Sequence, residues 1–483
     1  MSLTRFQSKA LPEGASEPAA APRVHVVTFG CQMNKYDSLL AEGRFRRRGY
    51  VTTESPDDAD VILFNTCSVR DHAEERVYSW LGQIQHAKQS RPNLVIGVMG
   101  CMAERVEGEL FRRAKHVDIV CGTRQFQHLP ELVDEIRARR AGGGRYDPHL
   151  IATGDGQVAV EREGEPYTGG RAGFLAVMRG CDLNCTFCIV PSVRGRVQSR
   201  PIDDLVREAQ WVVANGAQVI TLLGQTVNSY GEDLPVPAAN EVKQRGRQGR
   251  ASLADLLYRL QEIEGLARIR MITAHAAYAT RALAEAIRDC DKVERFLPLP
   301  AQHGSDRILK AMKRGYTSGL YRERAAMLRE IVPDLQLGSD WIVGFPTETD
   351  ADYEQCERVL EEQQFSVNYI FKYNPRPSTR AAEEFADDVP EAVKQERNQR
   401  LLRASEIVQA ARMRQEIGRE HRVFVESLSE KREGVVRGRT GTGLPVSLRA
   451  SADTLGTELR VRIEEASAFG LGASVIEPDP RPD

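Results

Sequence analysis

The sequence of 483 residues has no run of about 20 uninterrupted apolar residues, which is the length that a membrane-spanning helix needs. Residues 1–22 are rich in Ala, Pro, Glu and Ser and lack the apolar core of a signal peptide, so we expect a disordered tail there. The net charge of -2 gives no global sign of nucleic-acid binding, so any such surface must be local. We therefore expect a cytoplasmic protein that does not enter the membrane.

The composition is 41% hydrophobic and 28% charged, which is typical of globular proteins, and the length predicts two to four domains. Nine cysteines in a chain without an export signal indicate a reducing compartment. In such a compartment, clustered cysteines are metal sites or catalytic groups more often than disulfides.

Cys181, Cys185 and Cys188 form a CxxxCxxC run directly after an apolar stretch. No fourth cysteine or histidine lies at zinc-ligand spacing, and the nearest histidines, His149 and His275, are far away in the sequence. Three thiolates so close together suit a [4Fe-4S] cluster whose fourth iron stays open. The alternatives are structural zinc, a disulfide knot or inert core cysteines, and we prefer the cluster.

Residues 23–140 alternate short apolar runs with amphipathic stretches, a pattern typical of a parallel sheet flanked by helices. We expect strands at 24–29, 61–65, 94–99 and 117–120, a short edge strand at 51–53, and helices at 36–48, 71–89, 103–115 and 125–139.

Cys31, Cys67 and Cys101 each follow one of these strands, and ligands in open α/β sheets sit at the carboxyl ends of strands. We therefore expect the three to converge on one site. Cys121 also follows a strand, so a closed set of four remains an alternative, as do simply buried cysteines. We favour three, because each of these leads into a loop and then a helix.

The glycine run at 142–144 and the polar residues after it indicate a linker at 141–168. Residues 169–415 again alternate strands and helices, with an insertion expected at 232–250. Strands are expected at 174–178, 219–223, 268–273, 296–299, 335–343 and 367–371. Six such units predict a partial parallel barrel with its active site at the strand ends, although each glycine-rich strand end can also be an ordinary turn.

Residues 416–480 change to short strand-like runs separated by Gly, Ser and Thr, which is typical of a small OB-like β-barrel. Its basic residues form a footprint suited to RNA phosphates, with a solvated charged face as the alternative. The expected fold class is thus α/β, with an N-terminal open parallel-sheet domain, a central partial (β/α)6 barrel and a C-terminal β-barrel.

The CxxxCxxC run, with Phe187 before its last cysteine, resembles the signature of the radical SAM superfamily. The resemblance implies that the open iron binds S-adenosylmethionine, whose reductive cleavage gives a 5′-deoxyadenosyl radical. With the N-terminal cysteines and the basic last domain, the chain resembles the radical SAM methylthiotransferases over nearly its whole ordered length. The last segment is similar to their RNA-binding TRAM domain.

Within that family, the segments that begin at Gly30, Asn65 and Leu223 resemble the bacterial branch that acts on isopentenylated tRNA. That branch converts N6-dimethylallyladenosine at position 37 to its 2-methylthio derivative. The Cys-Pro-Lys-Asn sequence of the ribosomal-protein branch is missing. His303, Asn374 and Ser378 depart from the family pattern, which weakens the transfer of fine substrate contacts but not of the cluster ligands.

The resemblance implies an auxiliary [4Fe-4S] cluster on Cys31, Cys67 and Cys101, whose sulfur is methylated by one S-adenosylmethionine. A second molecule is cleaved at the CxxxCxxC cluster, and no catalytic residue is expected beyond the cluster ligands. The expected cofactor contacts are Gly224, Gln225, Asp340 and Gly344. The expected RNA contacts are Tyr373, Arg376, Arg437 and Arg439.

The expected partners are the tRNA anticodon arm, a reductant such as flavodoxin or ferredoxin, and a sulfur or cluster donor, with the chain itself a monomer. Two other functions remain as alternatives. One is a methylthiotransferase for threonylcarbamoyl-adenosine tRNA or a ribosomal protein. The other is an RNA-binding iron-sulfur protein without catalysis.

Overall fold

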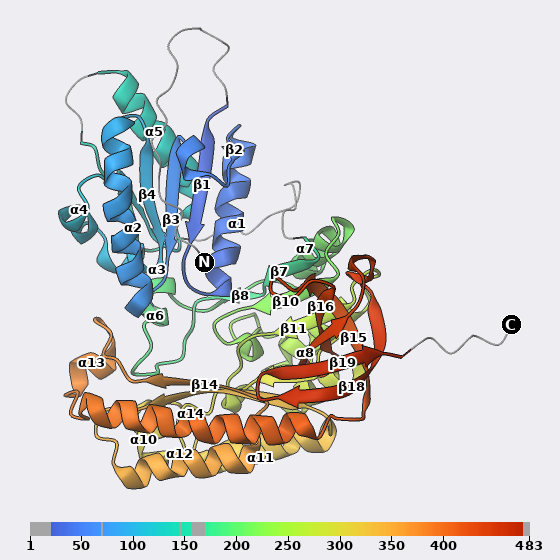
Figure 1. The fold of residues 1–483 in the computed structure, drawn as a ribbon. Helices are drawn as coiled ribbons and strands as arrows, with labels where there is room; N and C mark the ends of the chain where they lie inside the picture. Colours follow the sequence, from blue (N-terminus) through green and yellow to red (C-terminus); the bar gives the residue numbers. More distant parts are fainter. Residues whose placement is uncertain (1–20, 69–70, 144–146, 157–169, 477–483) are drawn as a thin grey trace, which may run out of the picture. The chain divides into compact units, whose positions relative to one another are not determined.

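The computed structural model describes residues 21–68, 71–143, 147–156 and 170–476, so most of the expected N-terminal tail lies outside the described residues (Figure 1). The chain divides into two compact units. The first contains Met1–Thr168 and Ile189–Arg196, and the second contains Gly169–Cys188 and Val197–Asp483. The segment Ile189–Arg196, which directly follows the CxxxCxxC run, was expected in the central barrel but folds with the first unit.

The first unit is built on a parallel sheet with the strand order β2-β1-β3-β4-β5-β6. The strands are β1 (Arg23–Thr28), β2 (Val51–Thr52), β3 (Val61–Thr66), β4 (Val95–Gly100), β5 (Ile119–Cys121) and β6 (Leu150–Ala152). Strand β6 lies inside the stretch that was expected to be a linker, and it pairs with β5. Three residues are too few to show a hydrophobic period, so the sequence pattern could not reveal this strand.

Helices cover both faces of this sheet (Figure 1). Side chains of α1 (Gln32–Arg47) and α5 (Leu129–Ala141) share one apolar core with it, and those of α2 (Asp71–Ser90), α3 (Cys101–Val106) and α4 (Glu109–Arg113) share the other. Burial on both faces explains why the strands are continuously apolar. The single helix expected at 103–115 is broken at Glu107, whose φ of 44° is left-handed.

The second unit contains the six expected parallel strands, in two three-stranded sheets. An isolated bridge between Ile269 and Val293 lies where the two sheets adjoin. The strands are β7 (Ala172–Ala176), β10 (Val219–Leu223), β11 (Arg268–Met271), β12 (Phe296–Pro298), β13 (Gln336–Val343) and β14 (Val367–Lys372). Helices α7 (Ile202–Ala214), α8 (Leu253–Gln261), α9 (Arg281–Asp289), α11 (Ser318–Ile331) and α12 (Asp350–Gln363) connect them. The partial parallel barrel is thereby confirmed.

Helix α14 (Glu391–Arg414) leads to a closed five-stranded barrel. Its strands are β15 (Glu420–Leu428), β16 (Val435–Thr440), β17 (Pro445–Arg449), β18 (Glu458–Ser467) and β19 (Gly470–Val475). The sequence pattern missed β19, because its small residues Gly, Ala and Ser carry little strand propensity. Among the described residues, no helix is long and apolar enough to cross a membrane.

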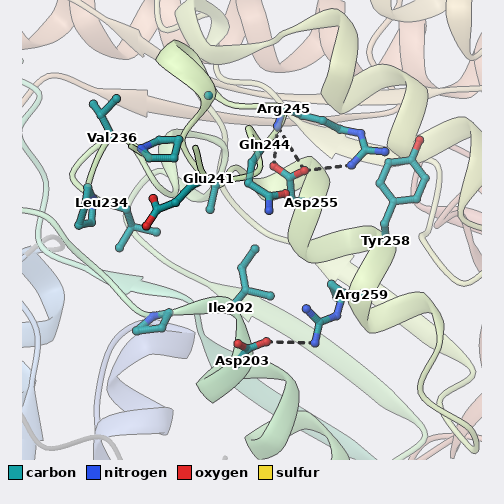
Figure 2. A pocket seen from close by; sticks show the side chains of 15 residues that line it. Ile202, Asp203, Leu234, Val236, Glu241, Gln244, Arg245, Asp255, Tyr258 and Arg259 are labelled. Atoms are coloured by element: carbon teal, nitrogen blue, oxygen red, sulfur yellow. Dashed lines mark hydrogen bonds and ion pairs between the residues drawn. The ribbon is translucent and has the colours of Figure 1, made fainter. Parts of the chain in front are cut away.

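The insertion at 232–250 forms one wall of a cavity of about 550 Å³ in the second unit (Figure 2). The arginines of this cavity pair with its own carboxylates: Arg245 with Asp255 at 3.0 Å, and Arg259 with Asp203 at 3.0 Å. No side chain that the sequence predicts to hold a cofactor or RNA lines the cavity. We therefore place the candidate site elsewhere.

Candidate functional site

The first group of candidate ligands lies in the first unit, where β1, β3 and β4 end. Cys31, Cys67 and Cys101 follow these strands, and the thiols of Cys67 and Cys31 both act electrostatically on Cys101. Gly30 has a φ of 108°, and a Cβ built on it would lie 2.4 Å from the Cβ of Cys67. The structure thus brings together the three cysteines that the sequence predicted to converge.

Two buried asparagines hold the loops that carry Cys31 and Cys67. The Asn34 side chain donates to Asn65 Oδ1 at 3.0 Å and to the Thr66 carbonyl at 2.8 Å, and Asn65 Nδ2 donates back to the Asn34 carbonyl at 2.7 Å. The Cys31 thiol lies 3.1 Å from Asn34 Oδ1. Both loops are therefore fixed by side chains before any ligand is bound.

Cys121 is set apart from these three. It lies in the apolar core with Ile119 and Val133, and burial together with Glu104 raises the pKa of its thiol. None of the other cysteines contributes to that shift. The geometry therefore groups three cysteines at this site and leaves the fourth as a core residue.

Burial raises the pKa of the Cys101 thiol to about 12. Such a thiol stays protonated at neutral pH until metal displaces the proton. Among the described residues, no three His, Cys, Asp or Glu side chains are arranged around a single ion, as structural zinc would require. Cysteines that bind separate irons of a cluster need no such arrangement.

The second group lies in the CxxxCxxC loop of the second unit. Cys181 and Cys185 are buried and Cys188 is half-buried. The loop is held at Thr186, whose N–H donates to the Met312 carbonyl at 3.0 Å and whose carbonyl accepts from Ala381 N–H at 2.7 Å. Phe187 packs against the apolar cluster that includes Met312. The position that the signature reserves for an aromatic residue is therefore used to anchor the loop.

Arg314 lies beside the cysteine loop, and the sequence reasoning did not single it out. It is buried, and its Nη1 donates to the Cys185 thiol at 3.1 Å while its Nε donates to the Tyr316 hydroxyl at 3.2 Å. Arg314 and Cys185 are 129 residues apart in the sequence, so no local motif joins them. A guanidinium in this position places a buried positive charge beside the cysteine loop.

His275 was noted in the sequence only as a distant histidine. Burial, helped by the charge of Arg314, lowers its pKa to about 3, so the ring is neutral at neutral pH. Its Nδ1 accepts from Ala277 N–H at 3.3 Å, which leaves the proton on Nε2. No atom of the described protein meets strict hydrogen-bond geometry with that buried Nε2–H, although the Arg314 backbone lies close enough to act on the pKa of the ring.

The residues expected to contact S-adenosylmethionine have different surroundings. A Cβ on Gly224 would lie 2.6 Å from Met178 Cγ, so this glycine allows close packing beside the cysteine loop. The Oε1 atom of Gln225 is buried without a hydrogen-bond partner in the described protein. The next residue, Thr226, places its hydroxyl 3.8 Å from the Cys181 sulfur. An unpartnered buried acceptor beside the cysteines fits a polar ligand there.

Gly344 has a structural explanation that needs no ligand. Its N–H donates to Glu348 Oε2 at 2.9 Å, and a Cβ would lie 2.3 Å from Lys394 Cγ of α14. Its φ of 71° also favours glycine. The structure therefore does not support a cofactor contact through the N–H of Gly344.

Tyr373, one of the expected RNA contacts, is buried. The ring is 5% exposed and packs edge to face on Phe345, with centroids 5.0 Å apart, so it offers no face to a base. Two other aromatic residues, Tyr369 and Phe371 of β14, are 60% and 45% exposed. The two-residue spacing of Tyr369 and Phe371, which places both rings on one face of a strand, was a signal that the sequence reasoning overlooked.

Strand register shows which face of the barrel these two rings occupy. Tyr369 lies opposite Asp340 and Phe371 lies opposite Ile342, so all four side chains point to one face of the sheet. On the other face, Trp341 Nε1 donates to Asn368 at 2.8 Å. Ile342 packs in the cluster that contains Phe187. The exposed rings thus share a face with the anchor of the cysteine loop.

Two of the predicted RNA-binding arginines lie on β16. Arg437 is exposed, and no acidic partner is found for it among the described residues. Arg439 is half-buried; its Nη1 donates to the Gly443 carbonyl at 3.0 Å, and its Nε lies 4.0 Å from Glu426. Arg376, the third, is half-buried after β14. Of these, Arg437 is the most available to a phosphate.

Two family models match the chain. Residues 23–122 match the model described as uncharacterized protein family UPF0004, and residues 175–360 match the radical SAM superfamily. The first match covers Cys31, Cys67 and Cys101, and the second covers the CxxxCxxC run. The two cysteine groups therefore lie in two separately recognised modules.

Several curated relatives are similar over most of their length. A tRNA-2-methylthio-N(6)-dimethylallyladenosine synthase of Protochlamydia amoebophila is 39% identical over 438 residues, which is 91% of this chain and 93% of the relative. Proteins of the same name from Bordetella petrii and Rhodopirellula baltica are each 39% identical, over 95% and 84% of this chain and 93% and 84% of their own.

Among solved structures, a radical S-adenosylmethionine methyltransferase from Kitasatospora setae, TsrM, superposes with a TM-score of 0.53. The match covers 76% of this chain and 78% of the other at 13% identity. This likeness shows a shared fold and nothing about the substrate.

Proposed function

The chain belongs to the family of tRNA-2-methylthio-N(6)-dimethylallyladenosine synthases and is a radical SAM enzyme, and we propose that it attaches a methylthio group to N6-dimethylallyladenosine at position 37 of tRNA. The observation that carries the proposal is the presence of two cysteine groups of three, one in each unit. Replacing an unactivated aromatic hydrogen by S-CH3 needs both a radical source and a sulfur source. Two separate groups of three cysteines can supply them.

The cofactors of the radical SAM superfamily are S-adenosylmethionine and a [4Fe-4S] cluster. The second unit fits them, because three cysteines lie beside the buried Gln225 Oε1, which has no hydrogen-bond partner in the described protein, and beside the buried His275 Nε2. On one-electron reduction this pair supplies a 5′-deoxyadenosyl radical, which removes hydrogen from an unactivated C–H bond. Gln225 and His275 would hold polar groups of the cofactor.

The protein's own groups prepare this site for a charged ligand. Arg314 donates to Cys185 and places a positive charge beside the sulfur that would bind iron. His275 stays neutral, so it offers an N–H donor without adding a second positive charge beside Arg314. The burial of Cys181 and Cys185 keeps water away from the reacting atoms.

In the first unit, Cys31, Cys67 and Cys101 would hold a second [4Fe-4S] cluster. Three protein ligands leave one iron free, and this iron would carry the sulfur that is transferred. One S-adenosylmethionine would donate the methyl group to that sulfur, and another would serve as the radical source. The grouping of three cysteines, with Cys121 apart, supports this assignment.

The tRNA would bind through aromatic rings and arginines. Sequence-specific RNA recognition uses splayed bases stacked on aromatic side chains, and the exposed rings of Tyr369 and Phe371 are suited to this. Arg376, Arg437 and Arg439 would contact phosphates of the anticodon arm. The target base must leave the loop stack to reach a buried site, and a stacking platform lowers the cost of that step.

The remaining partners follow from the chemistry. A low-potential electron donor such as flavodoxin or ferredoxin would reduce the radical SAM cluster, and a sulfur or cluster donor would replenish the auxiliary one. We further propose that the enzyme works as a monomer in the cytoplasm. The alternative substrates, threonylcarbamoyl-adenosine tRNA and ribosomal protein, have no support in the names of the relatives above.

Iron analysis tests the proposal directly. The protein is reconstituted anaerobically beside a variant with Cys31, Cys67 and Cys101 all changed to Ala. We expect about eight irons to fall to about four, with 5′-deoxyadenosine formation kept and methylthiolated tRNA lost. The matched control is Cys121→Ala, which should keep all of the iron. Unchanged iron in the triple variant would show that these cysteines are only packed side chains.

A further inference from the structure

The segment Ile189–Arg196 follows Cys188 in the chain yet belongs to the first unit. It contains the short helix α6 (Val190–Arg194), and two of its residues, Ile189 and Val193, pack directly on Cys101. The Thr123 hydroxyl donates to the Val193 carbonyl and fixes the segment from the other side. The residue after Cys188 thus begins a segment that forms one wall of the auxiliary cysteine site.

Arg194 ends this helix and is buried. Its Nη2 donates to Asp37 Oδ2 at 2.9 Å, and Asp37 itself is fully buried on α1, the helix that begins directly after Cys31. The two partners are 157 residues apart in the sequence. An ion pair at this depth costs desolvation energy that its mutual attraction often only balances. Its presence therefore calls for a role beyond stability.

The position of Arg194 indicates that role. Burial acts to lower the pKa of Arg194, but Cys101, Asp37 and Cys31 together raise it. The preceding residue, Val193, packs on Cys101, and the partner Asp37 lies on the helix that begins directly after Cys31. The guanidinium is therefore close enough for its charge to act at two of the three cysteines. The pairing with Asp37 alone does not explain the position of Arg194, because Cys101 and Cys31 also lie close to the guanidinium.

The second unit contains a comparable arrangement. Arg314 is also buried, and it donates to Cys185 of the CxxxCxxC run at 3.1 Å. Each group of three cysteines thus has beside it a buried arginine that is brought in from a distant part of the sequence. The repetition in two unrelated folds argues that the arginine serves the sulfur ligands and not the local fold.

We propose that Arg194 is a charge-compensating positioning residue of the auxiliary site, held by Asp37 so that its guanidinium stabilises negative charge on the cluster bound by Cys31, Cys67 and Cys101. The inference rests on the proposed function of these cysteines as cluster ligands. A [4Fe-4S]²⁺ cluster with three thiolates carries a net charge of about -1, and one-electron reduction by a low-potential donor adds another negative charge. A buried cation nearby favours the reduced form, so Arg194 raises the reduction potential.

The test measures that potential with the auxiliary cluster alone. The parent is the full chain with Cys181, Cys185 and Cys188 changed to Ala, reconstituted anaerobically and titrated with dithionite while EPR follows the reduced cluster. Arg194→Gln removes the charge and Arg194→Lys keeps it. The matched control is Arg140→Gln, which removes a largely buried arginine of the same unit that pairs with Asp118 away from the cysteines.

We expect Arg194→Gln to make reduction at least tenfold less favourable, which is about 59 mV for one electron. Arg194→Lys should lie close to the parent, and Arg140→Gln should match it. If Arg194→Gln loses its iron, retention of iron by Arg194→Lys supports the charge role, and equal loss in both overturns it. An Arg194→Gln variant that keeps all of its iron and has the reduction potential of the parent also overturns the proposal. A parent without iron would instead overturn the proposed function, and this inference with it.

Discussion

Gly100 provides the sharpest test of how the auxiliary cysteines are placed. It precedes Cys101 and has a φ of 100°. A Cβ there would lie 2.5 Å from the Thr66 carbonyl oxygen and 2.6 Å from Asn65 Oδ1. The first of these atoms is backbone, so it cannot turn away as a flexible side chain would. Gly100→Ala therefore forces β3 and β4 apart at their carboxyl ends, where Cys67 and Cys101 follow the strands.

The magnitude follows from two contributions. A side chain in the left-handed region costs about 1–2 kcal/mol, and forcing an extra carbon into a packed site adds about 1–3 kcal/mol. The matched control is Gly49→Ala in the same unit, because Gly49 has a φ of 87° but no atom within 4 Å of a built Cβ. It should show only the backbone cost, about 1–2 kcal/mol.

Hydrogen exchange provides the assay, since it reports the opening free energy of peptides in β3 and β4 separately from the second unit. Gly100→Ala should lower that free energy by about 2–5 kcal/mol, and the auxiliary iron should be lost. Equal shifts for Gly100→Ala and Gly49→Ala would refute the reasoning, because the strands would then have room that the structure denies.

Two further predictions concern the second unit. Replacing Tyr369 and Phe371 by Ala should weaken binding of substrate tRNA by about 1–3 kcal/mol for each stacked base, measured by filter binding, without changing the melting temperature. The control Ile407→Ala, at another exposed hydrophobic position on α14 (71% exposed), should leave binding unchanged, and a double aromatic variant with parental affinity would contradict the assignment. His275 has a folded pKa of about 3 against 6.5 for the free side chain, so the unfolded chain binds the extra proton between these values and stability falls as pH falls below about 6.5. The melting temperature of His275→Gln should therefore fall less than that of the parent between pH 7 and pH 5. Identical slopes of melting temperature against pH would show that this ring does not titrate on unfolding.

Local pattern was sufficient wherever the relevant residues lie close together in the chain. The strand-to-cysteine transitions at Cys31, Cys67 and Cys101 predicted both the parallel sheet and the convergence of the three thiols. The resemblance of the run at Cys181, Cys185 and Cys188 to the radical SAM signature implied a radical SAM module, and the family match confirms it. Strands that are short or built of small residues, such as β6 and β19, were not predicted, because they show no clear hydrophobic periodicity.

The roles of single polar and aromatic residues were harder to predict. Gly344 was expected to contact the cofactor, but its N–H donates to Glu348. The absence of a Cβ at Gly344 also lets α14 pack closely against it. Tyr373 was expected to contact RNA, but its ring packs on Phe345. Both residues belong to recognisable segments, and a segment does not say which of its side chains face inward. That choice depends on which helix covers the strand.

By itself the sequence predicted the order of the modules and the two sets of cysteines, because covalent spacing and strand period act over a few residues, and the resemblance of its motifs indicated the family. Only the tertiary structure decided that Arg194 meets Asp37 and that Arg314 meets Cys185, across 157 and 129 residues. It also decided that Ile189–Arg196 returns to the first unit and lies against Cys101. A buried cation needs a partner wherever the fold places it, and no local pattern encodes a partner that arrives from so far along the chain.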